Sequence, residues 1–139
     1  MYFLSKAKGK KRILELESFD YQIRLLSEFS ENDQELFLLY TLKDLRLLGR
    51  ELDRMIRAWT SGDIKSVESI MTKNMTEDGR LSSVYEKLIY ERNRNMASRI
   101  EDLLKEKETC LVVVGAAHLV GSRGIIEILK EKGYLVEQL

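Results

Sequence analysis

The sequence has few of the residues that make disulfides, histidine-rich metal sites or enforced chain breaks. Its 139 residues include one cysteine, one histidine and no proline. The single Cys110 excludes an internal disulfide framework, and the single His118 excludes an internal site that needs two imidazoles. Because proline is absent, long helices with few forced breaks are favoured. The length suits one domain, so we expect a single domain over residues 1–139.

An excess of charge of one sign and long apolar runs are also missing. The chain carries 23 Lys and Arg residues against 23 Asp and Glu residues, so its net charge is zero. This balance argues against a protein held to nucleic acid by bulk positive charge, and no nucleic-acid partner is expected. No segment reaches the roughly 18 apolar residues of a membrane span. The basic start is not followed by an apolar region, so we expect no signal peptide and, by default, a cytoplasmic location.

The pattern of apolar residues predicts an α/β fold that is mostly helical and contains a partial sheet. Residues 12–17 alternate in polarity and predict a strand, although the first turn of a helix is an open alternative. Apolar residues at spacings of three and four predict a helical middle over residues 18–107. The continuous apolar run 110–114 is typical of a strand that is buried on both faces, as in a parallel sheet. With a following helix that ends at Gly133 and a returning strand, it predicts a β-α-β unit over residues 108–139.

The strongest local signal for chemistry is His118, which closes the sequence Gly-Ala-Ala-His after the predicted strand. In open α/β sheets, ligands gather at the carboxyl ends of strands. We interpret Gly115 and Gly121 as structural turn residues on either side of the histidine. A neutral imidazole is a good metal ligand and a good general base near neutral pH. The alternative is a loop histidine that only hydrogen-bonds a nearby carbonyl.

A second signal is the pair Arg92 and Asn93, which falls on the apolar arc of a helix predicted from about residue 82 to 107. Arginine is rarely buried without a partner, so a carboxylate is expected beside it, and Glu17 and Glu15 are the candidates. The alternative is an Arg92 side chain that reaches the surface and covers apolar neighbours with its stem. Glu17 itself is a candidate metal ligand, general base or partner of Arg92, or else an ordinary carboxylate.

Taken together, these residues resemble a known family. The segments 91–95 (Glu-Arg-Asn-Arg-Asn), 112–121 and 133–137 are similar to the C-terminal half of the TraB/PrgY/GumN family, which includes the Tiki proteases. Residues 16–18 (Leu-Glu-Ser) are similar to the family's Leu-Glu-Thr element. The likeness covers nearly the whole chain. Each motif is common by itself, but their order along the chain is specific.

The resemblance implies a metal-dependent, protease-like hydrolase that acts on a peptide or protein substrate. It implies a divalent metal (manganese, cobalt or zinc) in the complete protein, with His118 and Glu17 as metal ligands. Arg92 and Asn93 match the family's helical Arg-Asn pair, and the resemblance implies that they join His118 and Glu17 as catalytic residues.

The sequence departs from the family at one point. The family's first histidine motif lies upstream of its glutamate element, and no histidine stands among residues 1–15. We therefore expect the chain to be the C-terminal part of a larger family domain, inactive alone, to which a metal need not be bound. Whether it is an enzyme stays open, and the alternative is a non-catalytic module, related to pheromone shutdown proteins, that binds a peptide or protein. Uncovered apolar surface predicts a homodimer or larger assembly.

Overall fold

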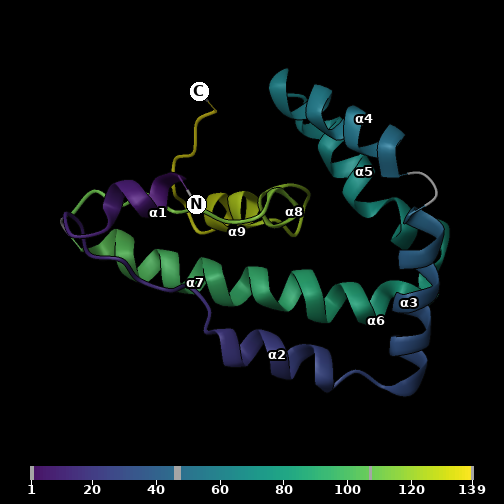
Figure 1. Ribbon diagram of the computed structural model, residues 1–139. Helices are drawn as coiled ribbons and strands as arrows, with labels where there is room; N and C mark the ends of the chain where they lie inside the picture. Colours follow the sequence, from purple (N-terminus) through teal and green to yellow (C-terminus); the bar gives the residue numbers. More distant parts are fainter. Residues whose placement is uncertain (1, 46–47, 107, 139) are drawn as a thin grey trace.

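The computed structural model describes residues 2–45, 48–106 and 108–138. All regular secondary structure in these ranges is helical (Figure 1). The α-helices, in chain order, are α1 (Tyr2–Ala7), α2 (Phe19–Ser27), α3 (Glu31–Leu45), α4 (Leu48–Thr60), α5 (Ile64–Glu77), α6 (Ser82–Tyr85), α7 (Glu91–Lys105), α8 (Ala116–Leu119) and α9 (Ile125–Glu131). A 3-10 turn, η1 (Gly79–Leu81), precedes α6, and a π-helix, η2 (Glu86–Tyr90), joins α6 to α7. None of these helices is both long enough and apolar enough for a membrane crossing.

The predicted α/β fold is wrong, because no strand and no sheet form within the described parts of the chain. The segments that the sequence predicts as strands, 12–17, 110–114 and 134–138, lie outside the helices and have no regular structure. The β-α-β unit predicted over 108–139 is therefore not formed by residues 108–138, and only its helix, α9, is present. Residues 46, 47, 107 and 139 of the predicted segments lie outside the described residues.

The apolar run before α8 shows why the strand prediction fails. Val112 and Val114 pack against the core, whereas Leu111 and Val113 are 71% and 63% exposed. The run is therefore covered on one side only, unlike a strand inside a parallel sheet. Leu135 repeats this pattern in the last segment, where it is 88% exposed. A continuous apolar run does not distinguish a strand with hydrogen-bonded neighbours from an extended segment that lies on helices.

A long central helix is built from α6, η2 and α7, which follow one another in a line (Figure 1). The sequence predicts a helix here, and the structure adds a π-helical turn at Glu86–Tyr90. A π-helix has one more residue between hydrogen-bonded groups than an α-helix, and such turns are frequent at functional sites. This turn ends immediately before α7, whose second and third residues are Arg92 and Asn93.

Among the described residues, the core forms two clusters. One lies where α3 meets η1 and α6, and contains Phe29, Leu36, Tyr40, Leu81 and Val84. The other holds α7 against α9, and contains Met96, Ala97, Ile100, Ile125 and Leu129. Side chains of the extended segments pack against this second cluster, including Leu16, Val112 and Val114. The segment before α2 and the segment before α8 are thus both attached to α7.

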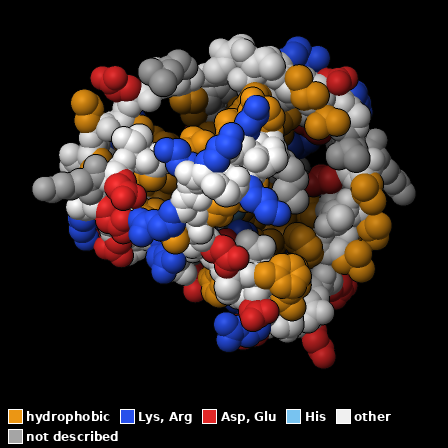
Figure 2. Space-filling view, turned by 60° about the vertical axis from the view of Figure 1, so that its left-hand side comes forward, with side chains coloured by type: hydrophobic (Ala, Val, Ile, Leu, Met, Phe, Trp, Pro, Cys, Tyr) orange, Lys and Arg blue, Asp and Glu red, His pale blue; other side chains and the backbone are white. Residues whose placement is uncertain are grey.

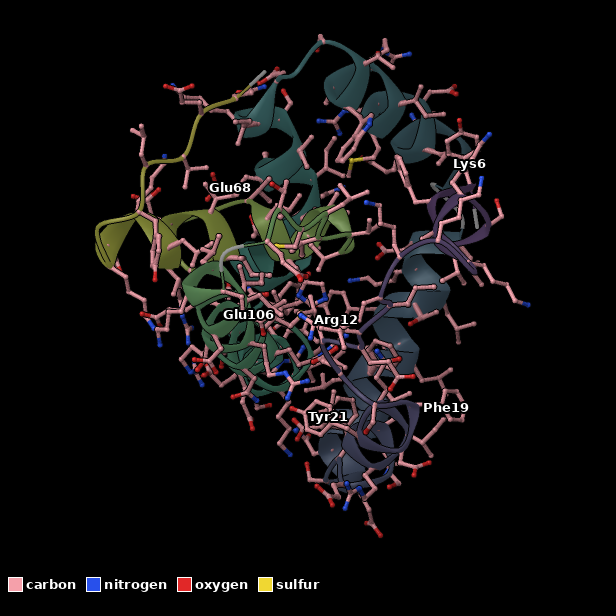
Figure 3. All side chains as sticks on the ribbon, turned by 90° about the vertical axis from the view of Figure 1, so that its left-hand side faces the viewer. Lys6, Arg12, Phe19, Tyr21, Glu68 and Glu106 are labelled. Atoms are coloured by element: carbon pink, nitrogen blue, oxygen red, sulfur yellow. The ribbon has the colours of Figure 1, made fainter. Side chains whose placement is uncertain are left out.

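Exposed apolar side chains recur at helical spacing on several helices, among them α2 and α4. The α2 stripe consists of Phe19, Ile23 and Leu26. The α4 stripe consists of Leu52, Ile56 and Trp59, each more than half exposed. Figure 3 shows Phe19 pointing away from the rest of the molecule, and Figure 2 shows hydrophobic side chains standing at the surface between charged ones.

Candidate functional site

Glu17 is positioned by the residues on either side of it. Leu16 packs against the cluster that joins α7 to α9. Ser18 is the N-cap of α2, where its side-chain oxygen accepts a hydrogen bond from the backbone N–H of Tyr21 at 3.1 Å. An N-cap serine satisfies one of the free N–H groups at the start of a helix. With an apolar anchor before it and a helix cap after it, Glu17 is fixed against α7. An exposed ion pair between Arg12 and Glu106 ties the preceding segment to the end of α7 (Figure 3).

Glu17 is held by Arg92 through a forked ion pair. The Nε atom of Arg92 lies 2.9 Å from Oε1 and 3.1 Å from Oε2 of Glu17, and Nη2 lies 2.7 Å from Oε2. The two side chains are 18% and 7% exposed, respectively, so the pair is largely shielded from water. Arg92 also donates through Nη1 to the backbone carbonyl of Leu88 at 3.0 Å. Of the two carboxylates considered from sequence, Glu17 is the partner, and Glu15 instead offers its backbone carbonyl to Arg99.

The ion pair determines the charge state of Glu17. Burial acts to raise the pKa of this carboxyl, but the hydrogen bonds and the positive charge of Arg92 outweigh burial and lower the pKa below its ordinary value of 4.5. The side-chain amide of Gln22 adds a weak hydrogen bond to Oε2 at 3.4 Å. Glu17 is therefore ionised at neutral pH, with both of its oxygens occupied by protein donors.

His118 is held by Asn93, the neighbour of Arg92 in α7. Its ring lies in the short helix α8 and is buried, with Nδ1 at 2.7 Å from Oδ1 of Asn93. Asn93 is 0% exposed, and its Nδ2 donates to the backbone carbonyl of Arg123 at 2.8 Å. A carbonyl only accepts hydrogen bonds, so the group that faces Arg123 is the amide NH₂ and the amide oxygen faces the imidazole. Nδ1 of His118 therefore carries the hydrogen, and Nε2 keeps its lone pair.

The electrostatic environment keeps this imidazole neutral. Burial is the main cause that lowers the pKa of His118 below 6.5, and the charge of Arg92 lowers it further, against an opposing effect of Glu17. The same two charges that pair with each other therefore act on the histidine. The structure brings Glu17, Arg92, Asn93 and His118, the four residues singled out from sequence, into one neighbourhood. Their catalytic and metal-binding roles stay a prediction.

The loop after α8 depends on two glycines. Gly121 has a φ of +84°, a left-handed conformation that favours glycine. A Cβ atom on Gly124 would lie 2.5 Å from the backbone oxygens of Leu119 and Val120, so no side chain fits there. Gly115, the other glycine interpreted as a turn residue, has a φ of −65°, which any residue adopts. The tight turn is thus at 121–124, and it aims the carbonyl of residue 123 at Asn93.

The side chain of Arg123 attaches this loop to the central helix. Its Nη2 lies 2.5 Å from a carboxylate oxygen of Glu86, and its guanidinium stacks 3.8 Å from the ring centre of Tyr90. Arg94 binds the other oxygen of Glu86 at 2.8 Å. The π-helix therefore holds the loop whose backbone carbonyl orients Asn93. Sequence reasoning missed Arg123 and Glu86 in this role, because a spacing pattern does not reveal which backbone carbonyl a buried amide will use.

The residues that the structure describes do not by themselves complete a metal site. His118 and Glu17 are the two predicted ligands, and no three His, Cys, Asp or Glu side chains converge anywhere in the parts of the chain that the structure describes. Catalytic zinc-type sites usually use three protein ligands. In addition, both oxygens of Glu17 already accept hydrogen bonds from Arg92. Of the two predicted ligands, His118 still presents Nε2, because Asn93 binds its other ring nitrogen, Nδ1.

Replacing Glu17 by glutamine tests the buried ion pair. Because the pKa of Glu17 is lowered in the folded protein, its stabilising effect is complete above the unfolded value near 4.5 and is lost as the pH falls through the folded value. Glu17→Gln should lower the free energy of unfolding at pH 7 by about 3 kcal/mol, since it leaves Arg92 shielded without a counter-charge. It should also flatten the loss of stability below pH 4.5. Urea unfolding from pH 3 to 8 measures both effects.

The matched control is Glu106→Gln, which breaks the exposed pair with Arg12 and should leave stability nearly unchanged. Equal losses in the two variants would contradict a special role of the Glu17–Arg92 pair.

A second prediction concerns the attachment of the 120–124 loop. Arg123→Ala should loosen the carbonyl that holds Asn93, so His118 should lose its single tautomer. Nitrogen-15 NMR of the ring measures this as a shift of Nδ1 from an N–H value toward the average of the two tautomers. Arg94→Ala removes the other cation on Glu86 without touching the loop, and it should keep the Nδ1–H form. A wild-type ring spectrum in Arg123→Ala would show that the attachment does not orient the histidine.

Comparison with known proteins bears on this site. The chain is 35% identical over 105 residues to a protein named "Metalloprotease TIKI homolog" of Amphimedon queenslandica, a match that covers 63% of this chain and 21% of that protein. It is 41% identical over 54 residues to "Metalloprotease TIKI2" of Xenopus tropicalis, which covers 37% of this chain and 10% of that protein. It is 26% identical over 158 residues to a "Metalloprotease TIKI homolog" of Nematostella vectensis, covering 96% of this chain and 34% of that protein.

The chain thus spans between 10% and 34% of the length of these relatives. No solved structure matches it. A profile of the TraB/PrgY/gumN family matches residues 1–138. Since this match extends over almost the whole chain and includes every residue of the candidate site, the chain belongs to the TraB/PrgY/gumN family.

Proposed function

We propose that this chain supplies one part of a metal-dependent site for peptide hydrolysis. The observation that carries the proposal is the convergence of two polar pairs on consecutive residues of α7: Arg92 holds the carboxylate of Glu17, and Asn93 holds the imidazole of His118. The relatives carry the name metalloprotease, which supports hydrolysis of a peptide or protein substrate as the reaction.

The chain's own residues prepare one reactive atom. Asn93 holds the hydrogen on Nδ1 of His118, so Nε2 presents a lone pair that can bind a cation or accept a proton. Burial and the charge of Arg92 keep the imidazole neutral at pH 7, which both roles require. Arg92, held by Glu17, places a guanidinium close to the same site, where it can orient a substrate carbonyl. Asn93 acts as a positioning residue, because it touches the histidine and not the bond to be cleaved.

The ligand count limits what the chain does alone. His118 and Glu17 supply two ligands, whereas a catalytic zinc-type site usually has three protein ligands. We therefore propose that the remaining ligands to manganese, cobalt or zinc come from outside the described residues and that this chain alone does not cleave peptides. In this arrangement it behaves as the C-terminal part of a larger family domain.

The second candidate is a non-catalytic module that binds a peptide or protein. The observation in its favour is that Arg92 already donates hydrogen bonds to both oxygens of Glu17, so a metal ion would have to compete with this ion pair. The exposed α2 and α4 stripes offer apolar surface for such a partner. The two candidates differ in whether binding needs His118 and a metal.

Metal binding by the isolated chain separates the candidates. Because Cys110 is an exposed thiol that can itself bind metal ions, the experiment uses the Cys110→Ser variant as its reference protein. We expect isothermal titration with Co²⁺ to give one weak site, with a dissociation constant above about 10 µM, that is lost in His118→Ala. Mass spectrometry should find no peptide cleavage by this chain alone.

Other results would change the proposal. Metal-dependent cleavage by the isolated chain would show that its site is complete. Peptide binding that survives both EDTA and His118→Ala, with no Co²⁺ uptake, would favour the binding module instead.

We also propose that the chain forms a homodimer through its exposed apolar surface. The α2 and α4 stripes each expose three large apolar side chains at helical spacing, surface that a second copy of the chain could cover. Sedimentation velocity should show a dimer at micromolar concentration, and Ile56→Glu in the α4 stripe should shift it at least tenfold toward monomer. Leu135→Glu, at a more exposed position outside both stripes, serves as the control. A wild-type monomer at 50 µM would contradict this proposal.

A further inference from the structure

A cavity borders the candidate site on the side of α3. It has a volume of about 230 Å³ and lies between α3, α5, the central helix and α8. Two of its walls come from the segments that carry the site. Leu88 and Ile89 line it one helical turn before Arg92 and Asn93, and Ala117 lines it directly before His118. The carbonyl of Leu88 is also the one that accepts a hydrogen bond from Arg92. The cavity is therefore lined by residues of both segments that carry the candidate site.

The lining of this cavity is apolar in character. Its three hydroxyl groups already have protein partners: Tyr40 donates to Asp78 at 2.6 Å, Thr41 to the carbonyl of Phe37 at 2.7 Å, and Tyr85 to the carbonyl of Met71 at 3.0 Å. The remaining walls are aliphatic or aromatic apart from Asp44, which is exposed. A polar or charged group would find few partners inside, whereas an apolar group would be removed from water.

The volume selects the size of the occupant. An apolar protein cavity of about 150 Å³ holds one benzene molecule. At 230 Å³ the cavity accepts one ring or one branched aliphatic side chain but is too small for the 300–1,000 Å³ typical of drug-sized ligands. The chemistry and size together describe a subsite for one large apolar residue.

We propose that this cavity, the α3–α8 subsite, holds one leucine, methionine or phenylalanine side chain of a peptide bound at the candidate site. This inference rests on the proposed function, because the peptide is the substrate or ligand proposed above. Ala117 and His118 both belong to the short helix α8, so a peptide whose side chain is seated against Ala117 contacts the helix that carries the imidazole. The subsite would then determine which residue lies beside the bond presented to His118.

Methyl NMR in the presence of EDTA tests the subsite without any metal or cleavage. The full chain, labelled with carbon-13 at the alanine, isoleucine, leucine and methionine methyl groups, is titrated with N-acetyl-leucinamide, N-acetyl-phenylalaninamide and N-acetyl-glycinamide to about 50 mM. We expect saturable shifts at Ala117, Leu88 and Met71 with the first two amides and no such shifts with the glycine amide.

Two variants make the test specific to the cavity. Ala117→Leu fills it and should weaken leucinamide binding at least tenfold, which agrees with the sensitivity of apolar pockets to added methylenes. Ala116→Leu places the same side chain one residue earlier, at a position outside the lining, and should keep wild-type affinity. Ile89→Ala enlarges the cavity and should shift the preference at least fivefold from the leucine to the phenylalanine amide. Far-UV circular dichroism checks that each variant is folded.

The outcomes separate this inference from the proposed function. The subsite is overturned if no saturable binding appears, or if binding remains in a folded Ala117→Leu variant. It is also overturned if only exposed methyl groups shift, such as those of Leu135. Each of these results counts against the subsite even if His118 binds Co²⁺. Saturable binding that is lost in Ala117→Leu supports the subsite, even if metal uptake and cleavage both fail.

Discussion

A buried amide, that of Asn93, is the constraint on which the assembly of the candidate site depends. Its side chain is 0% exposed, so both its NH₂ and its carbonyl need partners inside the protein. An unpaired buried polar group costs about 1–3 kcal/mol. The two partners are the backbone carbonyl of Arg123, inside the tight turn at 121–124, and the ring of His118, which precedes that turn. Satisfying one amide thus brings a helix, a loop and an imidazole together and also determines which ring nitrogen stays free.

The second polar pair follows from helix geometry. Consecutive residues of an α-helix point about 100° apart, so Arg92 and Asn93 face different neighbours. Arg92 reaches the segment before α2, and Asn93 reaches α8. Two adjacent positions on α7 therefore bind residues 17 and 118, which are 101 positions apart in the chain. The two pairs affect each other through charge, since Arg92 lowers the pKa of His118 while Glu17 opposes that effect.

The grouping of the four candidate side chains was easier to predict from sequence than the fold, although their roles stay a prediction. Arg92 and Asn93 stood out because polar residues on the apolar arc of a helix need buried partners, and the forked bond to Glu17 follows the same reasoning. His118 stood out because it follows the apolar run 110–114, and the family resemblance added its expected role as a metal ligand. The strands were predicted from apolar runs such as Cys110–Val114, and such a run shows that a segment contacts the core but not that a hydrogen-bonded neighbour exists. Arg123 could not be predicted, because its role depends on a backbone carbonyl that only the folded loop presents.

The π-helix Glu86–Tyr90 has a consequence for how this chain tolerates changes in length. A π-helical turn can be viewed as an α-helical turn with one residue inserted. Deleting a residue between 86 and 90 would restore an ordinary helix and turn everything before it by about 100° relative to α7. The face of α6 that packs against α3 would then point in a different direction relative to Arg92 and Asn93 on α7, so both sets of contacts could not form together. The spacing in residues between these two faces, and not only their chemistry, is therefore under constraint in this chain.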